Sequence, residues 1–314
     1  MLDVRYLKVD QVLFEYIECD EGVYIYNTNN ERMVQSTIDM INYLKEYKSG
    51  DSTNDPAIDN FIFGAGKRKL LDIKLKGFSI SKSFFLVFFK FMDATIITKI
   101  RFAFTLIGVI LLPFFFQKEL IVYFTEMKRV DWRTLVVVYV GQLIITMIHE
   151  LGHYYYYQKY ISSNQFRFGF LLRYFFLFMF YTNVNFIEQL SKKKQLKIMI
   201  GGIQIQMMIS GILCLIMLVN SSRILILLFF LNSFNILINL LPFIKTDGYW
   251  IVNLLIDSQD YMSSFKSWIK KEKKDIRLVE ILLSLANIVI IFFYYLDGSH
   301  TADTVVLLRE YEGE

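Results

Sequence analysis

Proline, cysteine and histidine are scarce in this chain of 314 residues, which contains 3 Pro, 2 Cys and 3 His. With only 15 Gly as well, the composition excludes a collagen-like chain and a low-complexity disordered chain. Cys19 and Cys214 lie far apart in different surroundings, so we expect neither a disulfide framework nor a cysteine metal site. Residues 1–30 are interleaved with acidic residues and hold no long apolar run, so we expect no cleaved signal peptide and a cytoplasmic N-terminus.

Hydrophobic residues, in contrast, are abundant. They make up 54% of the chain, and the mean hydropathy is +0.39. This is more than the core of a soluble domain of this size needs, so the composition indicates a membrane protein. The net charge of +4 is small beside 34 basic and 30 acidic residues, so no nucleic-acid partner is expected.

Stretches that are almost free of charge predict an α-helical multi-pass protein of the cell membrane with about five transmembrane helices, because about 20 apolar residues cross the hydrocarbon layer. The predicted spans are 102–117, 134–158, 198–222, 224–244 and 281–296. With the N-terminus inside, 28 of the 34 basic residues fall on the cytoplasmic side. The C-terminal tail, 297–314, is then expected outside, and 102–296 is expected to be the membrane domain.

The remaining segments differ from these spans. Residues 1–79 mix charges with short apolar stretches, and a strand-like run at 23–26 precedes a helical pattern, which predicts a small soluble cytoplasmic α+β domain. Residues 80–101 are apolar but interrupted by charges, which favours a helix lying in the interface; a first spanning helix over 80–100 is the alternative. Residues 168–187 alternate like a strand, which indicates a hairpin or re-entrant segment.

The sequence His149-Glu150-Leu151-Gly152-His153 is an HExxH pattern on a predicted helix. Residues four apart share one face of a helix, so both imidazoles can bind one Zn²⁺ ion per chain. Glu150 would then lie beside the open coordination position and serve as general base of a peptidase. Ionisable groups inside a membrane span are costly, which favours a functional role over a structural one.

A peptidase zinc site needs a third protein ligand. His300 lies in the tail expected on the other side of the membrane, and Glu188 follows the hairpin segment. Asp247 is the better candidate, because it follows a span that runs toward the cytoplasm, as does the span carrying the histidines. Pro242 would loosen the end of that helix, and Gly248 would let the chain turn sharply. The alternative is a solvated aspartate in an ordinary turn.

Two polar stripes accompany these residues. Gln142 and Thr146 share the helical stripe of the two histidines, and could support the site or only hydrogen-bond a neighbouring helix. On the next predicted span the stripe consists of three amides, at Asn232, Asn235 and Asn239. Asn239 is nearest to Asp247 and is the candidate for binding the substrate backbone or the oxyanion.

At these residues the chain resembles the site-2 protease family of intramembrane zinc metalloproteases. The HExxH pattern occupies 149–153, and Asn239, Pro242, Asp247 and Gly248 match the family's Asn-x-x-Pro-x(4)-Asp-Gly motif. The resemblance covers roughly 134–250 and implies a three-helix catalytic core. It also implies His149, His153 and Asp247 as ligands and Glu150 as base. Gly202 could be the family glycine of the middle helix, but Ile203 and Gln206 stand where the family has Pro and Asn.

The chain is most similar to short bacterial members that accompany modified-peptide and bacteriocin systems. This resemblance implies cleavage of a membrane-associated peptide near the cytoplasmic face, with a hairpin after HExxH that adds the substrate as a strand. A peptide-modifying enzyme or an exporter is the expected partner. The first 79 residues are similar to peptide-binding winged-helix modules, and a plain tethering domain is the alternative. The alternatives are cleavage of an anti-sigma or transcription regulator, a non-catalytic binding or immunity protein, and a transporter subunit.

Overall fold

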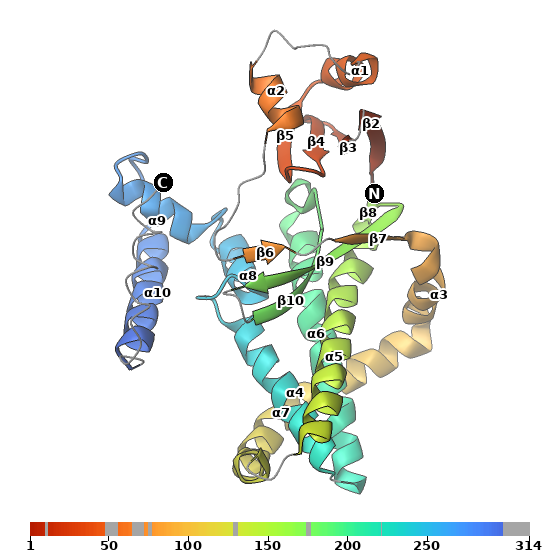
Figure 1. Cartoon of the computed structure of the whole chain (residues 1–314), viewed down its shortest axis with the longest axis vertical. Coiled ribbons are helices and arrows are strands. Elements are labelled where there is room, and N and C mark those ends of the chain that lie inside the picture. The colour runs from red at the N-terminus through yellow and green to blue at the C-terminus, as the bar shows by residue number, and fades with distance from the viewer. Residues whose placement is uncertain are drawn as a thin grey trace. The chain divides into compact units, whose positions relative to one another are not determined.

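A computed structural model describes residues 1–9, 12–47, 56–64, 72–74, 77–127, 131–173, 177–220 and 222–297. The chain divides into two compact units, Met1–Ile236 and Leu237–Glu314. Helices predominate, and strands form a small sheet near the N-terminus and a second sheet that includes a hairpin (Figure 1). The expected combination of a helical membrane protein with a small N-terminal β-containing domain is confirmed at this level.

The N-terminal sheet is a four-stranded antiparallel meander followed by two short helices. Its elements are β2 (Arg5–Val9), β3 (Val12–Cys19), β4 (Gly22–Asn27), β5 (Arg32–Ser36), α1 (Ile38–Glu46) and α2 (Pro56–Phe63). Alternation along β3 sends Phe14 and Tyr16 into a core with the two helices, and Ile17 into a second core on the other face. The β-then-α order predicted from the sequence is confirmed.

In the described part of the chain, four helices contain segments that are long and apolar enough to cross a membrane. They are α4 (Thr95–Met127), α5 (Trp132–Tyr160), α6 (Lys192–Val219) and α7 (Arg223–Leu240). The first candidate span is Thr95–Phe115, so it begins before the predicted residue 102 because Lys99 and Arg101 are part of the helix. The helix α10 (Leu278–Asp297) has a shorter apolar stretch, Leu278–Ile290, among the described residues, so the fifth span stays a prediction.

The segment before the first span forms a separate short helix, α3 (Lys82–Asp93). Its 12 residues are too few to cross the hydrocarbon layer, so the alternative of a spanning helix over 80–100 is not supported. The expectation of an interfacial helix remains a prediction.

Helices α5 and α6 cross with their backbones in contact at two glycines. An added Cβ on Gly152 would lie 2.5 Å from the carbonyl oxygen of Gly201, and one on Gly201 would lie 2.5 Å from that of Gly152. No side chain fits at such distances, and small residues are the usual means of bringing membrane helices this close. This crossing brings the HExxH turn of α5 against α6.

A second sheet follows α5 directly. Its central strand β9 (Gln165–Arg173) pairs with β10 (Leu177–Thr182) on one side, and on the other with β6 (Asp72–Lys74) and β7 (Phe78–Ser81). The predicted hairpin is therefore confirmed. β6 lies inside the range 1–79 assigned to the N-terminal domain, and β7 lies at its end, yet both pair with β9. The N-terminal β1 (Leu2–Asp3) pairs in parallel with β8 (Ile161–Ser162), just after α5.

The second unit holds the turn after α7 together with α8 (Asp247–Leu255), α9 (Tyr261–Ile269) and α10. Helix α7 ends at Leu240, before Pro242, as the restriction on residues preceding proline leads one to expect. Tyr261 is fully buried, and its hydroxyl donates to the carbonyl of Pro242 at 2.7 Å. Asn287 donates to the carbonyl of Phe243 at 3.0 Å, so α9 and α10 both hold this turn.

Candidate metal centre

The two histidines of the HExxH pattern lie side by side on the buried face of α5. Their side chains are 5% and 8% exposed, and the Nε2 atoms of His149 and His153 are 3.0 Å apart. Two nitrogens bound to one tetrahedral zinc ion at about 2.05 Å would be roughly 3.3 Å apart. The observed separation therefore suits two imidazoles that share one ion.

A backbone carbonyl of α6 orients His153. Its Nδ1 lies 2.8 Å from the carbonyl oxygen of Ile198. A carbonyl only accepts hydrogen bonds, so Nδ1 carries the proton and Nε2 keeps its lone pair for a metal. Contacts of this kind fix both the tautomer and the ring orientation of metal-binding histidines.

Gly202 of α6 keeps the space beside both imidazoles open. An added Cβ at this position would lie 2.4 Å from Nε2 of His153 and 2.6 Å from Nε2 of His149. Any larger residue would crowd the Nε2 atoms of both imidazoles. The family resemblance implies that Gly202 opens the middle helix, but it lies inside α6, where the space beside the imidazoles gives it a steric reason.

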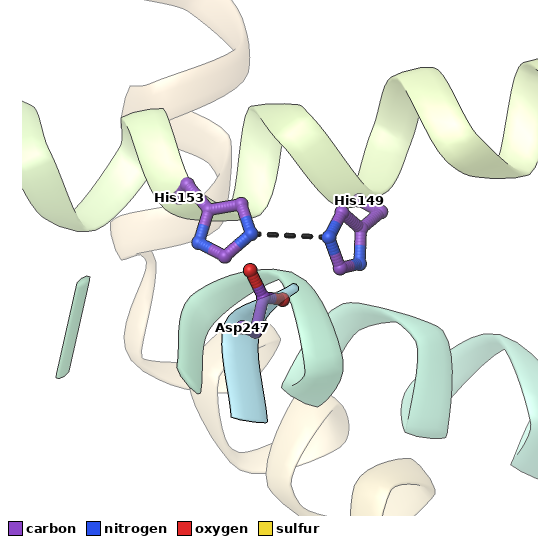
Figure 2. A group of neighbouring side chains, drawn as sticks. All are labelled: His149, His153 and Asp247. Carbon is purple, nitrogen blue, oxygen red and sulfur yellow. Dashed lines mark hydrogen bonds between the residues drawn. The ribbon is translucent and has the colours of Figure 1, made fainter. Parts of the chain in front are cut away.

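Asp247 completes a group of metal-binding type. One ligand atom from each of His149, His153 and Asp247 lies within 4.8 Å of the others. Figure 2 shows the imidazoles projecting from α5 and the carboxylate of Asp247 directed toward them. Two imidazole nitrogens and one carboxylate oxygen are a donor set that catalytic zinc sites use, so the residues present fit the ion.

Of the other two candidate ligands, only Glu188 lies among the described residues, and it is not part of this group. Glu188 lies in the short helix η1 (Ile187–Gln189), and its side chain is exposed. His300 lies outside the described residues.

The surroundings of Asp247 differ from the predicted turn. Asp247 and Gly248 are the first two residues of α8, with Thr246 as N-cap, and Gly248 does not have a positive φ. An added Cβ on Gly248 would instead lie 2.4 Å from the carbonyl oxygen of Leu240. The expectation of a sharp turn at Gly248 was therefore wrong: the glycine allows α8 to begin against the end of α7.

An ion pair anchors the segment just before Asp247. The Nζ atom of Lys245 lies 2.6 Å from Oδ2 of Asp260, and the hydroxyl of Tyr249 donates to Oδ1 of the same carboxylate. Burial raises the pKa of the Asp260 carboxyl, but the hydrogen bonds from Lys245 and Tyr249 outweigh it and bring the pKa below its ordinary value. Asp260 is thus ionised at neutral pH. As the N-cap of α9, it connects that helix to Lys245 in the turn and to Tyr249 in α8.

The remaining predicted residues of α5 have different surroundings. Glu150 is partly exposed, next to His149. The hydroxyl of Thr146 donates to the carbonyl of Gln142 at 3.0 Å, so it is engaged within its own helix. Gln142 lines an open apolar cleft with Val138 and Leu231, two helical turns before the HExxH pattern.

The asparagines of α7 also differ from one another in burial and contacts. Asn232 is fully buried and donates to the carbonyl of Gln206 at 3.1 Å and to the hydroxyl of Ser210 at 2.8 Å. It therefore joins α7 to α6. Asn239 is partly exposed near the end of α7, and its role as a substrate or oxyanion contact stays a prediction.

Sequence reasoning did not identify the groups that hold the ligands in place. The carbonyl of Ile198 has no sequence signal, because every residue carries one. Tyr261 and Asp260 could have been suspected only from their position after the aspartate motif.

Comparisons with known proteins give one relative of this chain. No family model matches, and no solved structure matches. The chain is 28% identical over 238 residues to the "Putative peptide zinc metalloprotease protein YydH" of Bacillus subtilis (strain 168), covering 76% of this chain and 84% of that protein. Together with the histidine and aspartate group, this similarity supports a zinc metalloprotease that is inserted in a membrane by apolar helices.

Proposed function

We propose that this protein is an intramembrane zinc endopeptidase of the site-2 protease type. The observation that carries the proposal is the group of His149, His153 and Asp247, whose ligand atoms lie within 4.8 Å of one another. The three would bind one zinc ion, and Gly202 would leave room for it. Zinc bound there would polarise the scissile carbonyl and make a water molecule more acidic.

Within this proposal the chain's own groups move the proton and stabilise the charge. Glu150 takes the proton of the attacking water and delivers it to the leaving amine, which is the usual task of the HExxH glutamate. The carbonyl of Ile198 holds His153 in the tautomer that leaves Nε2 available. Asn239 is our candidate for a hydrogen bond to the substrate backbone or to the oxyanion.

The hairpin after α5 gives a route for substrate binding. Among the described residues β9 has strand neighbours on both sides, whereas β10 pairs only with β9. A helical substrate hides its carbonyls, so it must be extended before cleavage, and an extended segment can add to a strand edge. β10 also packs against α5, the helix that carries both histidines.

We further propose that the substrate is a membrane-associated peptide, cleaved near the cytoplasmic face during maturation of a ribosomally made peptide. The word "peptide" in the name of the Bacillus subtilis relative supports this choice over an anti-sigma or transcription regulator. The N-terminus would be cytoplasmic and the C-terminus outside, as the distribution of basic residues predicts.

The test compares Glu150→Gln with Asp247→Asn, using cleavage of a coexpressed candidate peptide and zinc content. Glu150→Gln should reduce cleavage by about 10²–10⁴-fold and keep zinc, because the amide preserves shape but takes no proton. Asp247→Asn should lose zinc as well, since a neutral amide is a poorer ligand than a carboxylate. Unchanged cleavage in Glu150→Gln would reject the protease and favour a non-catalytic binding protein. Full zinc content in Asp247→Asn would remove Asp247 from the ligand set.

A further inference from the structure

Three polar side chains form a row across the N-terminal sheet. Glu15 of β3 is paired in register with Tyr6 of β2 and with Tyr26 of β4. Residues directly opposite one another share a face of the sheet, so the three side chains stand next to each other. Their face is the one opposite the core shared with α1 and α2, since side chains alternate along each strand.

The two tyrosines of the row reach the two ends of the β9–β10 hairpin. The hydroxyl of Tyr6 is hydrogen-bonded to that of Ser163 at 2.8 Å and accepts the backbone N–H of Asn164 at 3.1 Å. These two residues precede β9. The hydroxyl of Tyr26 accepts from the side-chain amide of Asn183 at 3.1 Å, just after β10.

Glu15 links both sides of the hairpin through one carboxylate. Its Oε1 lies 3.1 Å from the guanidinium of Arg167 on β9, and its Oε2 accepts from the amide of Asn185 at 2.7 Å. Glu15 is only 5% exposed. A buried carboxylate is costly unless it is paired and hydrogen-bonded, and both of these partners come from the hairpin. Loss of the charge would leave Arg167 without its counter-ion in a largely buried position.

The row therefore connects the N-terminal sheet to both ends of the β9–β10 hairpin. Strand β10 of this hairpin packs against α5, the helix that carries His149 and His153. We infer that Tyr6, Glu15 and Tyr26 position the β9–β10 hairpin, and that Glu15 is a positioning residue for the strand edge that receives the substrate. The substrate part of this inference rests on the proposed protease function. On this view the N-terminal domain is a structural part of the binding site for an extended peptide.

The experiment compares Glu15→Gln with Glu18→Gln in the full-length protein. Glu18 lies on the same strand and pairs with Arg5 at the surface, so its variant removes a carboxylate and an ion pair away from the hairpin. In Glu15→Gln we expect amide hydrogen exchange at 177–182 to become about tenfold faster, the loss typical of one charged hydrogen bond. KM for the peptide should rise several-fold, by a factor no larger than the increase in the exchange rate at 177–182. The kcat and the zinc content should stay nearly unchanged. Glu18→Gln should match the unmodified protein in all four measurements.

Equal exchange rates at 177–182 in the two variants would overturn the inference. If Glu15→Gln does not fold, the double variant Tyr6→Phe/Tyr26→Phe decides, because it keeps the rings and removes only the hydroxyls that contact the hairpin. Faster exchange at 177–182 in that variant supports the positioning role, and exchange like that of the unmodified protein overturns it. If the unmodified protein cleaves no peptide, the proposed function fails, whereas the exchange comparison still decides whether the row holds the hairpin.

Discussion

The two halves of α5 differ in sequence, and they differ strongly in their surroundings. In the first half, large apolar side chains such as Leu135, Val136 and Tyr139 are exposed, as expected for positions that face lipid. In the second half His149, His153 and most of the following tyrosines are buried against α6, α3 and the N-terminal sheet. What differs is how much of the helix surface neighbouring segments cover, which the helical stripe itself does not reveal.

Two glutamines of α5, one in each half, illustrate this difference in surroundings. Both polar atoms of the Gln142 amide are buried and lack a hydrogen-bond partner among the described residues. Gln158 lies sixteen residues later and donates to the carbonyl of Ser163 at 3.0 Å and to the hydroxyl of Tyr154. The Gln142 amide is thus unsatisfied at both atoms, whereas the amide nitrogen of Gln158 is part of a network and only its oxygen lacks a partner among the described residues. A polar stripe in a span shows that a face is special, but not which of its residues form the site.

The largest effect is expected from Gly202→Ala, at the α6 position facing the second half of α5. The added methyl group would lie 2.4 Å from Nε2 of His153, so we expect loss of zinc and about a hundredfold or greater loss of cleavage. Zinc analysis and peptide cleavage by mass spectrometry check both. The matched control is Gly141→Ala in the first half, where the methyl group meets only the end of the Leu228 side chain at 2.8 Å, which can rotate away. Normal zinc binding in Gly202→Ala would contradict the site described here.

A smaller effect is expected on removal of the metal with a chelator. In the proposed site, a zinc ion held by His149, His153 and Asp247 would restrain the HExxH turn of α5, so its loss should speed amide exchange around 148–156 by about tenfold or more. Exchange in the first half of the helix, around 134–142, should stay the same because no ligand lies there. Readdition of Zn²⁺ is the control and should restore the slow exchange. A uniform change along the whole helix would indicate general destabilisation instead.

The smallest effects separate the two glutamines. Gln158→Leu should lower the free energy of unfolding by about 1–3 kcal/mol, because it leaves the carbonyl of Ser163 without its donor. Gln142→Leu should lower that free energy by less than about 0.5 kcal/mol, or should increase it. The reason is that an unsatisfied amide is replaced by an apolar side chain. Chemical denaturation of the purified protein in detergent measures both. A larger loss in Gln142→Leu than in Gln158→Leu would reverse the comparison.

Much of the fold was predictable because membrane helices must satisfy their backbone groups internally and be about 20 residues long. Four of the predicted spans correspond to candidate spans of the structure, and the strand-like alternation at 168–187 corresponds to the β9–β10 hairpin. The first candidate span begins before the predicted residue 102, because Lys99 and Arg101 are part of α4. The pairing of β6 and β7 with β9 was not predictable, since strand partners far apart in sequence leave no local pattern.

The sequence by itself determined which candidate metal-binding groups are present. These are an HExxH pattern within one apolar helix and an Asp-Gly motif after a second apolar helix, in a chain with several segments apolar enough to cross a membrane. Spacing along a helix is a local property, so the shared face of His149 and His153 could be read directly. Only the tertiary structure decided what surrounds that face, the carbonyl of Ile198 and the clear space at Gly202. It also decided the buried contact of Glu15 with the hairpin, elsewhere in the molecule. These depend on contacts between segments distant in sequence, and the packing of one segment on another carries no periodic signal within either one.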